Sequence, residues 1–180
     1  MSAGRFAAWA ARLARIPLRD ISAEAADRVL LVAKTICAVH VFNAHVASVA
    51  LLRGPSMLPS VSITGDVVAV DRVSAHRGSV GVGDIVLVTA PDNPRKVIAK
   101  RVTGLGGDAV TFLVDPSSSQ EESETVVVPN GHVWIQGDNI YDSRDSRQFG
   151  PVPYGLIQGR VFFRLWPLER FGFIEQHTSL

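Results

Sequence analysis

Two residues of this chain have the types and surroundings needed for nucleophilic catalysis, Ser56 and Lys100. Ser56 lies in the run Gly-Pro-Ser-Met-Leu-Pro over residues 54–59, and Lys100 follows Val-Ile-Ala over residues 97–99. A serine hydroxyl is a weak nucleophile until a neighbouring base takes its proton. A lysine buried among apolar residues can be that base, because burial lowers the pKa of its ammonium group. We therefore predict that Ser56 and Lys100 form a catalytic dyad.

Each of these segments by itself also fits a structural role. Gly-Pro-Ser is a common turn sequence, and Lys100 would suit a solvated strand. Lys96 and Arg101 are alternative cations beside Lys100. None of the five histidines has the spacing to cysteines or carboxylates that is typical of a metal site. The pattern therefore disfavours a metallopeptidase and predicts chemistry without a cofactor.

Two further blocks favour the catalytic interpretation. Gly-Asp-Ile-Val opens a predicted strand at residues 83–86, and residues 137–150 form a polar loop rich in Asp, Ser and Arg. These four blocks, in this order after one apolar segment, resemble the type I signal peptidase family over roughly residues 29–168. That family consists of membrane-anchored serine endopeptidases with a Ser-Lys dyad. The short block spacing and the run over residues 145–153 are most similar to its mitochondrial inner membrane protease branch, of the subunit 1 type.

The resemblance implies supporting roles for residues of the 137–150 loop. It places Ser143 in hydrogen-bond contact with the lysine amine, which would orient the base without adding charge. It also makes Asp145 and Arg147 a structural ion pair beneath the site, with Asp138 and Arg144 as alternative partners. A turn serine and solvated loop charges are the plainer interpretation of the same residues.

Acyl transfer also needs hydrogen-bond donors for the oxyanion of the tetrahedral intermediate. The backbone N–H of Ser56 is the expected first donor. Many bacterial relatives place a serine hydroxyl two residues before the nucleophile, whereas this chain has Gly54 there. A backbone N–H made accessible by Gly54, or another side chain, would have to replace that hydroxyl.

Composition limits the partners and the organisation of the chain. With 180 residues, we expect one domain and one targeting or anchoring segment. The net charge of +1 provides no basic field for nucleic acid. Because Cys37 is the single cysteine, no intramolecular disulfide can stabilise the fold.

The amino terminus is typical of a mitochondrial targeting segment. Residues 1–19 contain four arginines and no acidic residue, and their apolar residues recur at helical spacing. We assign residues 1–28 to this basic amphipathic segment, and a surface helix is the alternative.

One apolar stretch, residues 29–52, predicts a transmembrane helix. Eighteen of its 24 residues are apolar, enough to cross a hydrocarbon core of about 30 Å. Lys34, His40, Asn43 and His45 interrupt it, and each is costly in lipid. The arginines before it would keep the amino terminus in the matrix and place residues 53–180 in the intermembrane space.

After residue 52 the pattern changes to short runs rich in Val, Ile and Phe, separated by Gly, Pro, Asn and Asp. We therefore predict a mainly β peptidase domain over residues 53–180, with curled or barrel-like antiparallel sheets as in signal peptidases. Residues 116–124 form a polar acidic loop. The predicted strands are 67–73, 85–90, 97–103, 109–114, 125–128, 132–136 and 160–165.

Together these features predict a serine endopeptidase of the mitochondrial inner membrane that removes amino-terminal sorting or signal peptides from proteins delivered to the intermembrane space. Its expected partners are presequence-bearing proteins and the lipid bilayer, and the family resemblance implies a heterodimer with a related second protease subunit. A non-catalytic partner subunit and a bacterial or plastid signal peptidase are the alternatives. A self-cleaving repressor shares the dyad but needs a helix-turn-helix, for which residues 1–52 offer no pattern.

Overall fold

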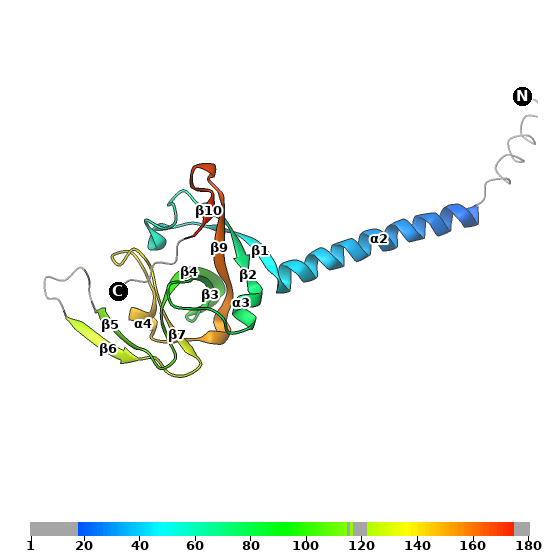
Figure 1. The fold of residues 1–180 in the computed structure, drawn as a ribbon. Helices are drawn as coiled ribbons and strands as arrows, with labels where there is room; N and C mark the ends of the chain where they lie inside the picture. Colours follow the sequence, from blue (N-terminus) through cyan, green and yellow to red (C-terminus); the bar gives the residue numbers. More distant parts are fainter. Residues whose placement is uncertain (1–17, 115, 117–121, 175–180) are drawn as a thin grey trace, which may run out of the picture. The chain divides into compact units, whose positions relative to one another are not determined.

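The computed structural model describes residues 18–114, 116 and 122–174 (Figure 1). Residues 1–17 of the predicted targeting segment 1–28 lie outside the described residues, and residues 18–28 are helical. Most of the predicted acidic loop also lies outside the described residues. The chain forms two compact units, Met1–Val41 and Phe42–Leu180.

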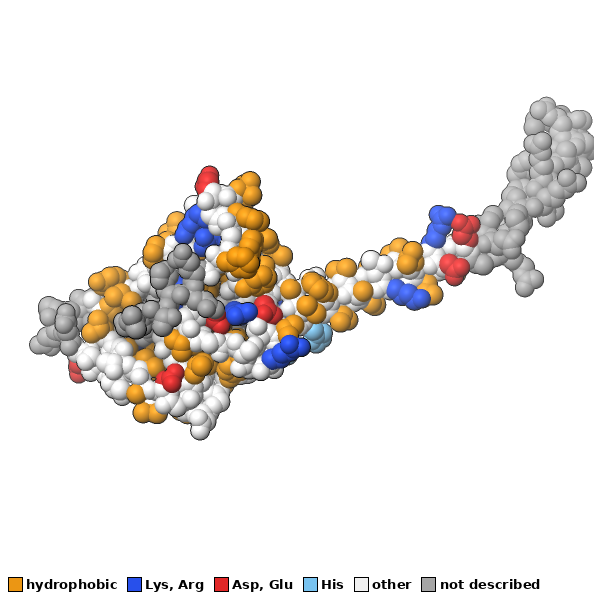
Figure 2. All heavy atoms as spheres, in the orientation of Figure 1, with side chains coloured by type: hydrophobic (Ala, Val, Ile, Leu, Met, Phe, Trp, Pro, Cys, Tyr) orange, Lys and Arg blue, Asp and Glu red, His pale blue; other side chains and the backbone are white. Residues whose placement is uncertain are grey.

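Helix α2 (Leu18–His45) provides the described part of the first unit. Apolar side chains are exposed along it, as Figure 2 shows, and they include Val29, Leu31 and Ile36. Across residues 18–114, 116 and 122–174, no helix combines the length and the apolar character that crossing a membrane requires. This finding does not confirm the membrane span predicted over residues 29–52.

The helix also ends earlier than predicted, because Ala47–Leu52 forms strand β1. Exposed Val49 and Leu51 alternate there with the more buried Ala50 and Leu52, which is the period of a strand. All six residues of β1 pair with β2 (Asp66–Asp71). A continuous apolar run has no period that separates helix from strand, so pairing with β2 decided the outcome.

In the described part of the second unit, eight strands form one antiparallel sheet, which confirms the predicted mainly β class. The order of seven of them is β1-β2-β9-β3-β4-β7-β8, and β10 pairs with β9. Since this path ends at β1 and β8, the described strands form no closed barrel. The other strands are β3 (Ile85–Ala90), β4 (Asn93–Leu105), β7 (His132–Gln136), β8 (Val152–Pro153), β9 (Ile157–Trp166) and β10 (Gly172–Phe173), and a separate hairpin pairs β5 (Ala109–Leu113) with β6 (Ser123–Val127).

The bounds predicted for β3 and β7 are the observed ones, whereas β1, β8 and β10 were not predicted. It also extended β2 to residue 73, where the chain instead turns into the short helix α3 (Arg72–His76). The side chain of Asp71 accepts hydrogen bonds from the backbone N–H groups of Val73 and Ser74. This N-cap stops the strand and begins the helix.

Strand β3 lies at the centre of the packing. Val86 and Val88 belong to one hydrophobic cluster, and Ile85 and Leu87 belong to a second one. The strand is therefore buried on both faces and gives its neighbour β4 a rigid apolar support. Strand β4 carries Lys100.

Candidate active site

Ser56 lies in the 3-10 turn η1 (Pro55–Met57), and the chain on both sides fixes this turn. Gly54 before it has φ 118°, in the left-handed region that favours glycine. A Cβ at Gly54 would meet no atom within 4 Å, so backbone conformation rather than space requires the glycine. From the 137–150 loop, Asn139 donates its backbone N–H to the carbonyl of Ser56 (3.1 Å) and its side-chain amide to the carbonyl of Pro55 (3.2 Å).

Lys100 lies opposite Val86 in the β3–β4 ladder, and Val86 is fully buried. Directly paired side chains in a sheet lie within about 5.5 Å, so the lysine stem packs against apolar atoms. Lys100 as a whole is only 2% exposed. Burial lowers the pKa of Lys100 to about 8; Asp145 opposes this shift and Arg147 adds to it. A substantial fraction of the amine is therefore neutral in mildly alkaline solution.

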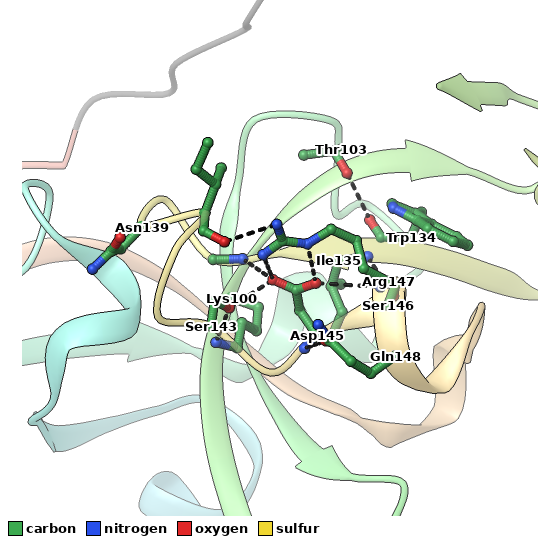
Figure 3. Close-up of polar contacts among 12 residues, drawn as sticks. Lys100, Thr103, Trp134, Ile135, Asn139, Ser143, Asp145, Ser146, Arg147 and Gln148 are labelled. Atoms are coloured by element: carbon green, nitrogen blue, oxygen red, sulfur yellow. Dashed lines mark hydrogen bonds and ion pairs between the residues drawn. The ribbon is translucent and has the colours of Figure 1, made fainter. Parts of the chain in front are cut away.

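A chain of hydrogen bonds starts at this amine (Figure 3). Nζ of Lys100 donates to Oγ of Ser143 at 2.7 Å. The same hydroxyl donates to Oδ2 of Asp145 at 2.6 Å. The structure thus brings Ser143 and Lys100 into direct contact, in the arrangement that the family resemblance implies.

Asp145 is 0% exposed and remains charged because several donors surround it. Arg147 donates from Nε to Oδ1 and from Nη2 to Oδ2, both at 2.9 Å, and the N–H of Gly137 donates to Oδ2 at 2.9 Å. Burial raises the pKa of Asp145, but the hydrogen bonds from Arg147, Ser143 and Gly137 outweigh it and hold the pKa below its ordinary value. Asp145 also caps the short helix α4 (Ser146–Phe149). The ion pair between Asp145 and Arg147 is present as the resemblance implies.

Ser56 and Lys100 line the same cleft, whose volume is about 580 Å³. Among the described residues, no hydrogen bond joins their side chains directly; catalytic contacts in unliganded enzymes often tighten only with substrate. No group of three or more His, Cys, Asp or Glu side chains in these residues is placed to hold a metal ion. The cleft is lined by apolar Leu52, Met57 and Leu87 and by basic Arg53, Lys96 and Arg144, among others.

The structure also places the residues that the sequence left as alternatives. Arg101 donates from Nε and Nη2 to the two carboxylate oxygens of Asp138, each at 2.7 Å. Asp138 therefore pairs with Arg101 and not with Arg147. Arg144 forms an ion pair with Asp92 at 3.1 Å, and Lys96 is exposed at the cleft.

Sequence reasoning missed Gly137 and Asn139 as parts of the site. A Cβ on Gly137 would lie 2.5 Å from the carbonyl oxygen of Ser56 and closer still to Oγ of Ser143. Only glycine fits where these two segments meet. The sequence feature that could have pointed to them is their place in the 137–150 loop, which Gly137 opens just before the run of Asp, Ser and Arg residues.

The sequence is similar to proteins of one known family. The sequence matches the family described as signal peptidase, peptidase S26, over residues 25–116 and 114–166. It is 48% identical over 154 residues to the mitochondrial ATP-independent inner membrane protease subunit 1a of Arabidopsis thaliana, covering 86% of this chain and 91% of that protein. It is 43% identical over 139 residues to the mitochondrial inner membrane protease subunit 1 of Homo sapiens, covering 77% and 81%. A solved signal peptidase I from Enterococcus faecalis has 25% identity and a TM-score of 0.39, covering 45% of this chain and 95% of that structure. The chain belongs to the peptidase S26 signal peptidase family.

Proposed function

We propose that this peptidase is a serine endopeptidase with Ser56 as nucleophile and Lys100 as general base. The observation that carries the proposal is the burial of Lys100 in the cleft that Ser56 also lines, with its pKa lowered to about 8. A neutral amine in that position can accept the proton that Ser56 must lose.

In the first step, Oγ of Ser56 attacks the scissile carbonyl while the neutral amine of Lys100 takes the hydroxyl proton. The tetrahedral oxyanion is stabilised by backbone donors that include the N–H of Ser56. The ammonium then protonates the leaving amine, and an acyl ester remains on Ser56. Lys100 then takes a proton from water, whose oxygen attacks the ester. As the carboxylic acid product leaves, the ammonium returns that proton to Oγ of Ser56, which restores both residues.

The cleft supports a substrate bound as an extended chain. Its lining includes residues 50–57 from β1 and η1 and residues 96–100 from β4. An extended peptide between these segments could add main-chain hydrogen bonds to a strand and seat alternate side chains in small pockets. Such a site suits cleavage of the unfolded amino-terminal segment of a preprotein.

The proposed setting is the mitochondrial inner membrane, on the side of the intermembrane space. The substrates would be preproteins carrying sorting or signal peptides. Two relatives are named as subunits of a mitochondrial inner membrane protease. By that similarity, we propose a related second subunit as a partner and association with the inner membrane. Alkaline carbonate extraction and protease access after rupture of the outer membrane test the location and the exposure of the catalytic domain.

The enzymatic test uses purified full-length protein and a presequence peptide. Ser56→Ala and Lys100→Ala should each abolish cleavage and keep the β fold. The double variant should be about as inactive as either single one, because the two residues act as a unit. Lys100→Arg should also fail, since a guanidinium does not deprotonate at accessible pH.

Comparative amino-terminal proteomics of mitochondria with and without the protein should show uncleaved sorting signals and identify the substrates. Near-normal cleavage by Ser56→Ala or Lys100→Ala would refute the dyad. Wild-type protein that cleaves nothing but is required for cleavage by another subunit would favour a non-catalytic partner.

A further inference from the structure

Three arginines from separate parts of the chain converge on residues 59–62, the segment that follows the proposed nucleophile. Arg101 lies on β4 and Arg164 on β9, and Arg170 ends the 3-10 turn η3 (Leu168–Arg170). Figure 1 shows β9 leading into this carboxyl-terminal turn, coloured orange to red. Residues 59–62 are called the 59–62 segment below.

Ser60 is the meeting point of the three side chains. Arg101 donates from Nη2 to its hydroxyl at 3.1 Å. Arg164 donates from Nη2 to its carbonyl, and Arg170 donates from Nη2 to the same carbonyl at 3.4 Å. Hydrogen bonds from charged donors are about twice as strong as neutral ones, so they are well suited to hold a loop.

Arg170 reaches furthest along the segment. Its Nη2 also donates to the carbonyl of Pro59 at 3.0 Å, and its Nη1 donates to the hydroxyl of Ser62 at 2.9 Å. The planar guanidinium therefore bridges Pro59, Ser60 and Ser62. A lysine ammonium is a point charge and cannot copy that spread of donors.

The 59–62 segment is connected rigidly to Ser56. Met57 and Val61 are 3% and 2% exposed, and the N–H of Val61 donates to the carbonyl of Met57 at 2.8 Å. Only Met57 and Leu58 separate Ser56 from the clamped residues. A displacement of Ser60 would thus be passed to the nucleophile, and misplacement by about 1 Å can lower a rate about a hundredfold.

We propose that Arg170 is a positioning residue: by clamping the 59–62 segment together with Arg164, the carboxyl-terminal turn η3 holds Ser56 in its reactive place. Arg164 extends the link, because its Nη1 donates to the carbonyl of Arg170 at 3.4 Å. Arg170 lies beyond residue 166, where the family match ends. Its role is therefore inferred from contacts in this chain. The proposal rests on the proposed role of Ser56 as nucleophile.

Arg170 is exposed and its bonds lie at the surface, so its loss should leave the fold intact. For Arg170→Gln we expect kcat to fall about tenfold to a hundredfold, with KM for a presequence peptide changed less than about twofold. The midpoint of the pH–rate profile should stay in place, because Lys100 and its partners are untouched. Arg170→Lys should recover part of the rate. Arg77→Gln, at the exposed arginine that follows the last residue of α3, is the matched control and should behave as wild type.

A double-mutant cycle and hydrogen exchange test the clamp itself. Ser62→Ala removes the acceptor of Nη1, so its effect on kcat should be smaller in the Arg170→Gln background than in wild type. Backbone amides of residues 54–65 should exchange about tenfold faster in Arg170→Gln than in wild type or Arg77→Gln.

Unchanged exchange in residues 54–65, or an unchanged kcat in an enzyme whose activity depends on Ser56, would overturn the proposal. So would a kcat loss that only follows a loss of folded protein. If wild-type protein shows no Ser56-dependent cleavage but exchange still accelerates, the clamp stands and the proposed function fails.

Discussion

Lys100 and Ser143 are joined by a hydrogen bond whose direction is determined by a third group. The hydroxyl proton of Ser143 is committed to Oδ2 of Asp145 at 2.6 Å, because a carboxylate can only accept. Ser143 therefore accepts from Nζ of Lys100 at 2.7 Å. One N–H of the amine is used in this bond, and the lone pair of the neutral form stays available for the proton of Ser56.

This relationship predicts different effects for two neighbouring serines. Ser143→Ala should keep the fold and lower kcat about tenfold to a thousandfold, the scale of positioned acid–base catalysis. Ser146 is buried, and its hydroxyl accepts from the N–H of Ile135 at 3.0 Å. Ser146→Ala should therefore cost about 1–3 kcal/mol of unfolding free energy and leave kcat of the folded enzyme nearly unchanged. Kinetics and chemical denaturation of both variants check this, and a larger kcat defect in Ser146→Ala would reverse the assignment.

The pH–rate profile should report the ionisation of Lys100. With its pKa lowered to about 8, kcat/KM should rise with pH and level off above that value, well below the ordinary range of lysine. A profile that is flat from pH 6 to 10, or that rises only near pH 10.5, would show that this amine is not the base.

Unfolding stability should depend on the same group. The pKa of Lys100 is lower in the folded protein than its ordinary value of 10.5, so the unfolded chain binds the proton more tightly between pH 8 and 10.5. The wild type should gain stability as pH rises through this window. The free energy of unfolding of Lys100→Met, taken relative to that of wild type, should be highest below pH 8. It should fall by on the order of 3 kcal/mol by pH 10.5, because only the wild type gains stability over this range. Chemical denaturation of both proteins at pH 7, 9 and 10.5 measures the difference between their free energies of unfolding. A difference that does not change with pH would contradict the lowered pKa.

Gly137 lies against the backbone of Ser56 and the side chain of Ser143, and substituting it tests whether this contact is needed for activity. Gly137→Ala would drive a methyl group against the carbonyl of Ser56 and the hydroxyl of Ser143, so activity should fall at least a hundredfold. Gly155→Ala is the matched control, since a Cβ there meets nothing within 4 Å and the φ of Gly155 is not in the left-handed region. Equal activity of the two alanine variants would mean that the two segments can separate without loss.

The sequence by itself determined the β class of the second unit and the residues proposed for its chemistry. Turn residues bracketed β3 and β7, and four blocks marked Ser56, Lys100 and the 137–150 loop. These features are local, because strand period and turn chemistry are set within a few residues. The sequence did not separate helix from strand in residues 29–52, where apolar character alone carries no period.

Tertiary structure decided which charges pair and which backbone contacts hold the site. Asp145 joins Arg147, the pair that the family resemblance implied, whereas Asp138, named as an alternative partner in that pair, joins Arg101 on β4. The contacts of Arg170 with the 59–62 segment span more than 100 residues of sequence. Distances of this kind depend on how β4, β9 and the loops stack around β3, and no local pattern of residues encodes them.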